Sequence, residues 1–210
     1  MIAADMASRA GAPKQTGFSR LEAAARLQLC AVAEDGEVRG RHIAALLAFA
    51  PSVARCGKQL RFAFEHGPTA MWVAEVLGNN ASLVDVGAGG GVVDIDRPQI
   101  VLGRYGFRDG RWFFGQGMDA ALGISRGAVH AAGTLNRQGL KIECPSAPMM
   151  LTLTAVMTRL GIEARPTEGQ PRTAISAGDV PAALDLLGIE GVAQDYRRLR
   201  ETKTVARKRS

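Results

Sequence analysis

The stretch IAALLAFAP at residues 43–51 decides the fold of this chain, together with SRGAVHAAG at residues 125–133. Apolar side chains in the first stretch recur at the three- and four-residue spacing of one helix face, which predicts a helix over residues 38–50 whose apolar stripe contacts a partner. This helix ends before Pro51, because proline has no backbone N–H to donate. The second stretch predicts that partner as a helix over residues 125–135, with its first serine as the N-cap.

The same pattern follows each of these helices. After the first helix, KQLRFAFE at residues 58–65 alternates in the manner of a half-buried strand, and TAMWVAEVLGNN at residues 69–80 indicates a short helix stopped by glycine. After the second helix, LKIEC at residues 140–144 indicates the strand and APMMLTLTAVMTRLG at residues 147–161 the helix. Each half therefore predicts helix, strand, helix, strand, turn, strand, and a short helix, DVPAALDLLG, closes the second half.

Two such units predict a tandem-duplicated α/β (α+β) fold with pseudo-twofold symmetry, in which the central helices pack together and the strands form a curved sheet. The first unit with its connector covers residues 18–117, and the second covers residues 118–190. Residues 1–17 are rich in small and polar side chains and predict a disordered tail. Residues 191–210 predict a basic C-terminal helix or tail.

The glycine-rich stretch LVDVGAGGGVVDID at residues 83–96 has two interpretations. An aliphatic run, an acid and G-x-G-G-G is similar to the first motif of S-adenosylmethionine methyltransferases, in which a helix must start after the glycines. Here the glycines are followed by β-branched residues and by Pro98, which are poor material for that helix. We therefore favour two antiparallel strands joined by a glycine turn over a cofactor loop.

The connector at residues 97–117 sets five aromatic residues among glycines and arginines. Arginine contacts phosphate and bases stack on aromatic rings, so Arg104, Arg108 and Arg111 could bind nucleic acid. A packed linker with solvated arginines is the favoured interpretation.

The order of the predicted elements resembles the LAGLIDADG fold of homing endonucleases. From about residue 38 to residue 200, the chain more closely resembles the N-terminal domain of the WhiA-like bacterial regulators of sporulation and cell division. The stretches that carry this resemblance, besides the alanine- and leucine-rich helix before Pro51, are RGAVHAAGTL at 126–135, ECPSAP at 143–148, LTAVMTRLGIEAR at 153–165, DVPAALDLLG at 179–188 and YRRLRETKTVA at 196–206. The resemblance implies a LAGLIDADG-like fold and a DNA-associated role in transcription.

Two features depart from these families. In an active LAGLIDADG nuclease each central helix ends in an acid before its last glycine, and the two acids hold divalent metals. The matching positions here are Ala50 and Ala132, whose methyl groups cannot ligate a cation, so we expect no nuclease chemistry, no metal and no cofactor. WhiA-like regulators also carry a C-terminal helix-turn-helix domain after a linker helix, whereas this sequence ends within what resembles that linker. We therefore expect either a shortened relative or a fragment.

Positive charge is concentrated towards the C-terminal end. Of a net charge of +6, most lies in the last 17 residues, which hold seven Lys or Arg side chains against two acids. The resemblance implies a non-catalytic, DNA-associated regulator, and this charge pattern predicts that it contacts phosphates without reading the sequence. The expected DNA contacts are Arg61 and Lys141, at equivalent strand positions of the two units, and the tail residues Arg197, Arg198, Arg200, Lys203, Arg207, Lys208 and Arg209.

Other functions stay open at this point. The tail is equally compatible with a solvated end, and the chain could be a protein-interaction module that binds another transcription factor without contacting DNA. An enzyme is the weakest hypothesis, because His42, His66 and His130 are isolated in the sequence and none has a recognisable catalytic partner. No apolar run approaches the ~18 residues of a membrane span, so we expect a cytoplasmic, nucleoid-associated protein with no membrane partner.

Overall fold

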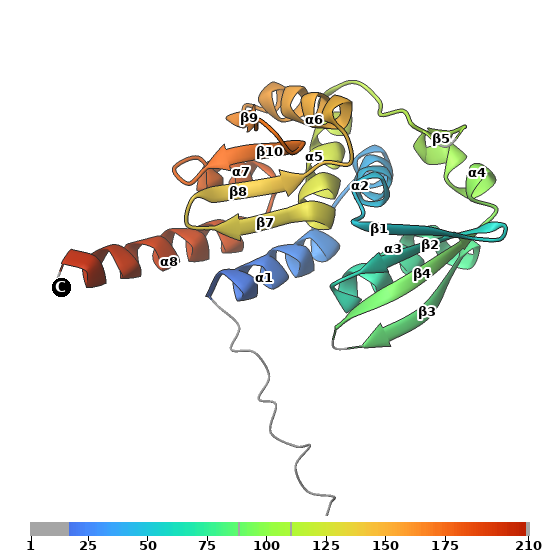
Figure 1. Ribbon diagram of the computed structural model, residues 1–210, viewed down its shortest axis with the longest axis horizontal. Helices are drawn as coiled ribbons and strands as arrows, with labels where there is room; N and C mark the ends of the chain where they lie inside the picture. The colour runs from blue at the N-terminus through green and yellow to red at the C-terminus, as the bar shows by residue number, and fades with distance from the viewer. Residues whose placement is uncertain (1–16, 88, 110, 209–210) are drawn as a thin grey trace, which may run out of the picture.

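Two units with the same order of elements make up most of the structure (Figure 1). The computed structural model describes residues 17–87, 89–109 and 111–208, with side chains to Glu201. The first unit consists of α2 (Gly36–Ala48), β1 (Ser52–Cys56), β2 (Gln59–Phe64), α3 (Gly67–Leu77), β3 (Ala81–Gly87) and β4 (Gly90–Asp96). The second consists of α5 (Met118–Ala132), β7 (Gly133–Asn136), β8 (Gly139–Glu143), α6 (Ala147–Arg159), β9 (Ala164–Pro166) and β10 (Arg172–Ser176).

The remaining elements flank or join these units. The connector holds α4 (Pro98–Val101), η2 (Gly103–Tyr105), β5 (Phe107–Arg108) and β6 (Arg111–Trp112), and a short η1 (Gly78–Asn80) follows α3. Before the first unit comes α1 (Gly17–Ala31), and after the second come α7 (Val180–Leu186) and α8 (Glu190–Lys208). Residues 1–16 of the predicted tail (residues 1–17) and the last two residues of the chain lie outside the described residues, whereas Gly17 begins α1.

The two four-stranded sheets share one topology, which confirms the predicted duplication. Their strand orders are β1-β2-β4-β3, here called the first sheet, and β7-β8-β10-β9, the second sheet, and all pairs are antiparallel. Arg61 lies between Ala54 and Asp94 in the first sheet. Lys141 lies between Thr134 and Ala174 in the second. Arg61 and Lys141 therefore occupy equivalent positions, as expected.

The predicted order of elements was wrong in one respect, because each central helix is followed by a two-stranded hairpin. The sequence interpretation missed β1 altogether and placed most of β7 in the last turn of the second central helix. That helix ends at Ala132, because Gly133 turns to an extended conformation and a Cβ there would lie 2.4 Å from the Val129 carbonyl oxygen. The same helix begins at Met118, so Ser125 is not its N-cap but a buried residue in its middle.

The central helices α2 and α5 pack against each other along most of their length (Figure 1). Two glycines of α5, four residues apart and therefore on one helix face, form the contact. A Cβ on Gly123 would lie 2.4 Å from the Val38 carbonyl oxygen, and a Cβ on Gly127 would lie 2.3 Å from that of His42. The backbones of the two helices thus touch directly, which is possible only where one helix has no side chain.

The glycine-rich stretch forms the expected hairpin, because β3 and β4 pair antiparallel on either side of it. The cofactor-loop interpretation was wrong, since strand rather than helix follows the glycines. Packing accounts for two of these glycines. A Cβ on Gly90 would lie 2.1 Å from the Phe64 carbonyl oxygen, and one on Gly91 would lie 2.5 Å from the Ala70 Cβ atom on α3. The helix therefore lies directly against the hairpin.

The terminal helices attach to the second unit. Glu22 of α1 accepts a hydrogen bond from the backbone N–H of Leu135 at 2.7 Å, on the edge strand β7. Tyr196 of α8 is fully buried, and its hydroxyl donates to the carbonyl oxygen of Asn136 at 2.8 Å. The last turns of α8 extend away from the body of the molecule (Figure 1). In the part of the chain that the structure describes, no helix combines the length and apolar character needed to cross a bilayer.

Candidate nucleic-acid interface

Each sheet has one face packed against helices and one face turned to solvent, which we call its outer face. In the first sheet Phe62, Val93 and Ile95 point inward and are buried. Because side chains alternate along a strand, the residues between them point outward, and these include Arg61 and Asp94. The same alternation turns Ile142 inward and Lys141 outward in the second sheet.

The outer face of the first sheet carries more acid than base. Arg61 donates two hydrogen bonds to Asp94, at 2.8 and 2.7 Å, so this arginine is already paired with a carboxylate. The hydrogen bonds from Arg61 lower the pKa of Asp94 below its usual value, and Asp94 in turn raises the pKa of Arg61. By strand register, Asp85 and Asp96 also point to this side. A face of this charge repels phosphate more than it attracts it.

The outer face of the second sheet carries the opposite charge balance. The register places Lys141, Arg165 and Arg172 on this side, against the single acid Glu143. Arg172 is paired with Glu143 at 2.5 Å, and Lys141 donates to Gln138 at 3.3 Å. Lys141 and Arg165 are thus the two cations on this face without a carboxylate within ion-pair distance among the described residues.

The described arginines of α8 contact the body of the protein or a neighbour on the helix. Arg197 pairs with Asp185 at 2.7 Å, and Arg198 pairs with Asp195 at 3.3 Å. Arg200 donates to the carbonyl oxygen of Ala177. The side chains of Lys203, Arg207 and Lys208, and Arg209 as a whole, lie outside the described residues.

The helix ends that hold metal-binding acids in active LAGLIDADG nucleases carry alanine here. Ala132 is the last residue of α5, and Ala50 lies two residues beyond the end of α2. Within residues 17–87, 89–109 and 111–208, no group of three or more His, Cys, Asp or Glu side chains is arranged to hold a metal ion. At both helix ends a methyl group therefore lies where those nucleases have a carboxylate.

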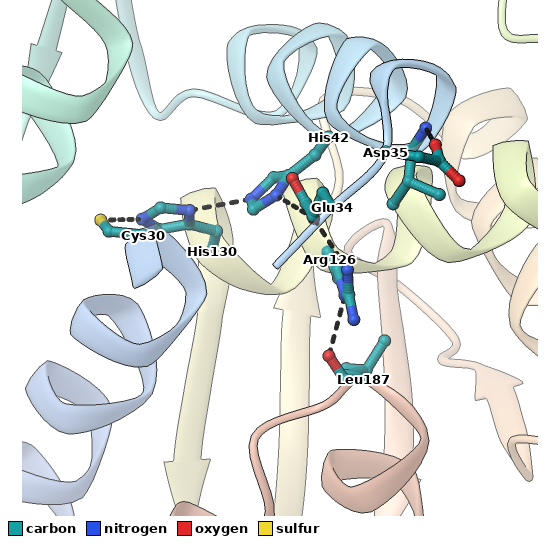
Figure 2. Close-up of polar contacts among 8 residues, drawn as sticks. Cys30, Glu34, Asp35, His42, Arg126, His130 and Leu187 are labelled. Atoms are coloured by element: carbon teal, nitrogen blue, oxygen red, sulfur yellow. Dashed lines mark hydrogen bonds and ion pairs between the residues drawn. The ribbon is translucent and has the colours of Figure 1, made fainter. Parts of the chain in front are cut away.

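A buried chain of polar side chains crosses the interface between α2 and α5 (Figure 2). The carboxylate of Glu34 lies 2.9 Å from Nδ1 of His42, whose Nε2 lies 3.0 Å from Nδ1 of His130. Nε2 of His130 lies 2.9 Å from the Thr69 hydroxyl. Glu34 also accepts from Arg126 at 2.9 Å. The interpretation of His42 and His130 as isolated was therefore wrong, because the two imidazoles contact each other.

Burial and the neighbouring charges determine the protonation states of the side chains in this buried row. Burial lowers the pKa of His42 despite the opposing effect of Glu34, and burial followed by the neighbouring His42 lowers the pKa of His130 far below its usual value. Burial alone would raise the pKa of Glu34, but the hydrogen bonds and charges of His42 and Arg126 outweigh it and lower that pKa. Both imidazoles are thus neutral at pH 7, and each donates Nδ1–H towards the carboxylate end.

The sequence gave one signal for these contacts, because His42 and His130 each lie within a predicted central helix. Their pairing could not be predicted, since 88 residues separate them.

Comparison with known proteins shows similarity in structure alone. No protein-family profile matches the chain, and no curated protein matches its sequence. Full-length DUF199/WhiA from Thermatoga maritima superposes with a TM-score of 0.63 at 13% identity, over 86% of this chain and 66% of that one. The N-terminal LAGLIDADG domain of DUF199/WhiA gives a TM-score of 0.58 at 13% identity, over 84% of this chain and 92% of that domain.

A homing endonuclease shares the same architecture. I-DmoI, in a complex with DNA and Mn, superposes with a TM-score of 0.54 at 10% identity, over 73% of this chain and 97% of that one. The chain spans less than two thirds of full-length DUF199/WhiA but nearly the whole of its LAGLIDADG domain. The chain therefore has the tandem LAGLIDADG fold of the DUF199/WhiA N-terminal domain and of I-DmoI.

Proposed function

We propose that this protein is a non-catalytic, DNA-binding transcriptional regulator whose main contact surface is the outer face of the second sheet together with α8. The observation that carries the proposal is the charge of that face, where Lys141 and Arg165 are not neutralised by a described carboxylate. In addition, I-DmoI, which has the same fold, is described in complex with DNA.

The proposed binding mode is contact with phosphates. Lysine and arginine side chains on a sheet face and on a protruding helix attract the DNA backbone without distinguishing bases, so affinity falls steeply as salt rises. Lys203, Arg207, Lys208 and Arg209 add four positive charges near the C-terminal end of the sequence. Arg197, Arg198 and Arg200 contribute earlier on α8, near the β7–β8 turn that Tyr196 fixes.

Arg61 is the weakest of the proposed contacts. Its guanidinium is held by two hydrogen bonds to Asp94, and reaching a phosphate requires that this pair be broken. Contact through the first sheet is further opposed by Asp85 and Asp96. We therefore propose that DNA lies asymmetrically, closer to the second unit than to the first.

Absence of catalysis is part of the proposal. A phosphodiesterase of this fold needs carboxylates at the ends of both central helices to hold its metal ions, and Ala50 and Ala132 have none. We expect no magnesium- or manganese-dependent cleavage of a supercoiled plasmid by the purified protein. Plasmid cleavage that a chelator abolishes would contradict the proposed absence of catalysis.

The binding experiment is a titration of a labelled duplex by the full chain at several salt concentrations. One variant combines Lys141→Gln with Arg165→Gln, and a second replaces Lys203, Arg207, Lys208 and Arg209 by glutamine. Each lost phosphate contact should reduce the slope of log K against log salt by about 0.9. Substitution is preferable to deletion of α8, because Tyr196 is part of the core.

The matched control for the first variant removes two charges elsewhere, with Arg39→Gln on α2 and Arg159→Gln on α6, both exposed. This control should leave the slope nearly unchanged. Equal reductions of the slope in both double variants would mean that binding depends on net charge alone, which would contradict a defined interface. If the unaltered chain binds no duplex at low salt, the proposed function fails.

A protein-interaction module that binds another transcription factor is the second candidate. It is favoured by the exposed aliphatic side chains Leu83, Val84 and Val86 on the edge strand β3, which border the acidic outer face. An edge strand can pair with a strand from a partner. This candidate predicts co-elution with a full-length WhiA-type regulator in size-exclusion chromatography, and loss of co-elution in the Val84→Lys variant.

The biological setting also belongs to the proposal. The resemblance to WhiA-like regulators implies control of sporulation or cell division by a cytoplasmic protein on the nucleoid. Crosslinking and immunoprecipitation of the tagged protein from its own cells would test this. Recovery of chromosomal DNA well above that from an untagged control supports nucleoid association, and recovery equal to that control contradicts it.

A further inference from the structure

The connector between the two units lines a groove that shares no residue with either outer face. The groove has a volume of about 320 Å³, and its lining includes Arg41 from α2, Arg104 and Arg108 from the connector, and Phe113 after β6. A volume of this order suits one small ligand. Gly115 allows the α2 side chain to reach the groove, because a Cβ there would lie 2.9 Å from the Arg41 guanidinium.

Positive charge dominates this groove. Arg108 pairs directly across the β5–β6 hairpin with Arg111, and like charges in that arrangement destabilise a hairpin unless an anion lies between them. Arg104 lies over the ring of Tyr105, 4.7 Å from its centroid, and Arg41 pairs with Glu37 at 2.9 Å. Within the described part of the chain, no carboxylate lies within ion-pair distance of Arg104, Arg108 or Arg111.

An aromatic ring lies exposed beside these charges. Phe107 and Trp112 face inward and contact each other, with ring centroids 4.9 Å apart, so alternation turns Arg108, Arg111 and Phe113 outward. Phe113 is 58% exposed. It pairs with Gly106, which has φ +98° and where a Cβ would lie 2.2 Å from the Phe113 carbonyl oxygen. No side chain on the facing residue therefore covers the ring.

We propose that this connector groove binds an unpaired nucleotide, with its phosphate on Arg104 and Arg108 and its base stacked on Phe113. Guanidinium groups bind phosphate through several N–H donors, and an exposed aromatic ring is a stacking platform for any base. Bases within a duplex are already stacked and cannot cover this ring. The ligand is therefore a free nucleotide or a single strand, which share this chemistry, and its site is separate from the proposed duplex interface.

The experiment measures fluorescence anisotropy of a labelled oligothymidylate of about ten nucleotides, within the usual site size for single strands. We expect the full chain to bind it at low salt. Phe113→Ala, and Arg104→Gln combined with Arg108→Gln, should each weaken binding at least ~5-fold. The matched controls are Leu151→Ala, an equally exposed apolar residue on α6, and Arg39→Gln with Arg159→Gln, and neither should change affinity by more than ~2-fold.

Competition identifies the source of the nucleotide. Displacement of the probe by thymidine monophosphate supports a free nucleotide, and displacement only by unlabelled oligothymidylate supports a single strand. The inference is overturned if the unaltered chain does not bind the probe, or if Phe113→Ala binds it as tightly as the unaltered chain does. Lys141→Gln with Arg165→Gln should leave this binding intact. Failure of the unaltered chain to bind duplex DNA would therefore count against the proposed function and not against the connector groove.

Discussion

Glu34 links the two units, because its carboxylate contacts one side chain from each of them. It follows α1, its side chain is only 1% exposed, and it holds both His42 of the first unit and Arg126 of the second. Arg126 also donates to the carbonyl oxygen of Leu187 at the end of α7, as Figure 2 shows. A buried carboxylate is tolerable only because these donors replace water, so each member depends on the others.

Removing this carboxylate should therefore be costly. In Glu34→Ala, Arg126 remains buried with its charge uncompensated, which should lower the free energy of unfolding by about 3–5 kcal/mol. Urea unfolding followed by circular dichroism measures the change. The control is Glu37→Ala, whose exposed pair with Arg41 should contribute less than about 1 kcal/mol. Equal effects in the two variants would contradict the assigned role of Glu34.

The two buried imidazoles make stability depend on pH. Their pKa values are lowered in the folded protein from an ordinary value of 6.5, so below about pH 6.5 the unfolded chain takes up protons that the folded protein does not. Stability should be highest above this pH and should fall as pH decreases, by at most about 1.4 kcal/mol per pH unit for each histidine. Glu34, with its lowered pKa, adds its own loss only below about pH 4.5.

Urea unfolding at several pH values between 5 and 8, for the unaltered chain and for His130→Gln, is the appropriate measurement. Glutamine cannot titrate, so the variant should show a shallower dependence on pH. A slope equal to that of the unaltered chain would show that His130 does not contribute to the dependence.

At the scale of elements, the contact between α2 and α5 holds the two units together. Glycine weakens an isolated helix, so its presence at Gly123 and Gly127 needs a reason in packing. The reason is the backbone of α2, whose carbonyl oxygens occupy the space where side chains would lie. Alanine and leucine residues around this contact then exclude water from two cores that meet at the helix pair.

A methyl group at this contact should therefore destabilise the protein. In a solvent-exposed helix Gly→Ala stabilises by about 0.5–1 kcal/mol, but at Gly127 the new Cβ would lie 2.3 Å from a backbone oxygen of α2. We expect Gly127→Ala to lower the free energy of unfolding by about 1–3 kcal/mol, because the helices must separate. Thermal and urea unfolding both report this.

The matched control is Gly40→Ala on α2, where the nearest atom to a new Cβ is 3.8 Å away in the ring of Tyr105. This variant should be neutral or slightly stabilising. If Gly127→Ala is as stable as Gly40→Ala, the helices have room to adjust and the close contact is not a constraint on sequence.

At the scale of the whole molecule, the two units share a sheet topology but differ in surface charge. The two sheets have the same strand order, yet the outer face of the first is acidic and that of the second is basic. Asp94 occupies the position that Ala174 holds in the second sheet, so the equivalent cations Arg61 and Lys141 differ in whether they are paired. The two units therefore share their sheet topology but not the charge of their outer faces.

Neutralising acids of the first outer face should strengthen binding to duplex DNA. Asp85→Asn with Asp96→Asn removes two negative charges and leaves the Arg61–Asp94 pair in place. We expect affinity to rise severalfold at low salt and the gain to shrink as salt rises, because the effect is electrostatic. A salt series of duplex titrations measures this.

The control for this variant removes two acids away from both outer faces and from α8, with Glu75→Gln on α3 and Asp119→Asn in the first turn of α5, both exposed. It should raise affinity less than the outer-face variant. A larger gain in the control would place the DNA on another surface.

The sequence alone determined the duplicated fold, the two central helices and the glycine hairpin, because these follow from apolar spacing and turn residues within short segments. It missed β1 and β7, because neither strand alternates clearly enough to distinguish it from the end of a helix. The tertiary structure alone decided that Arg61 is paired with Asp94, 33 residues away, and that His42 and His130 meet within the core. Such pairings depend on which distant segments the fold brings within a few ångströms, and local periodicity carries no information about that distance.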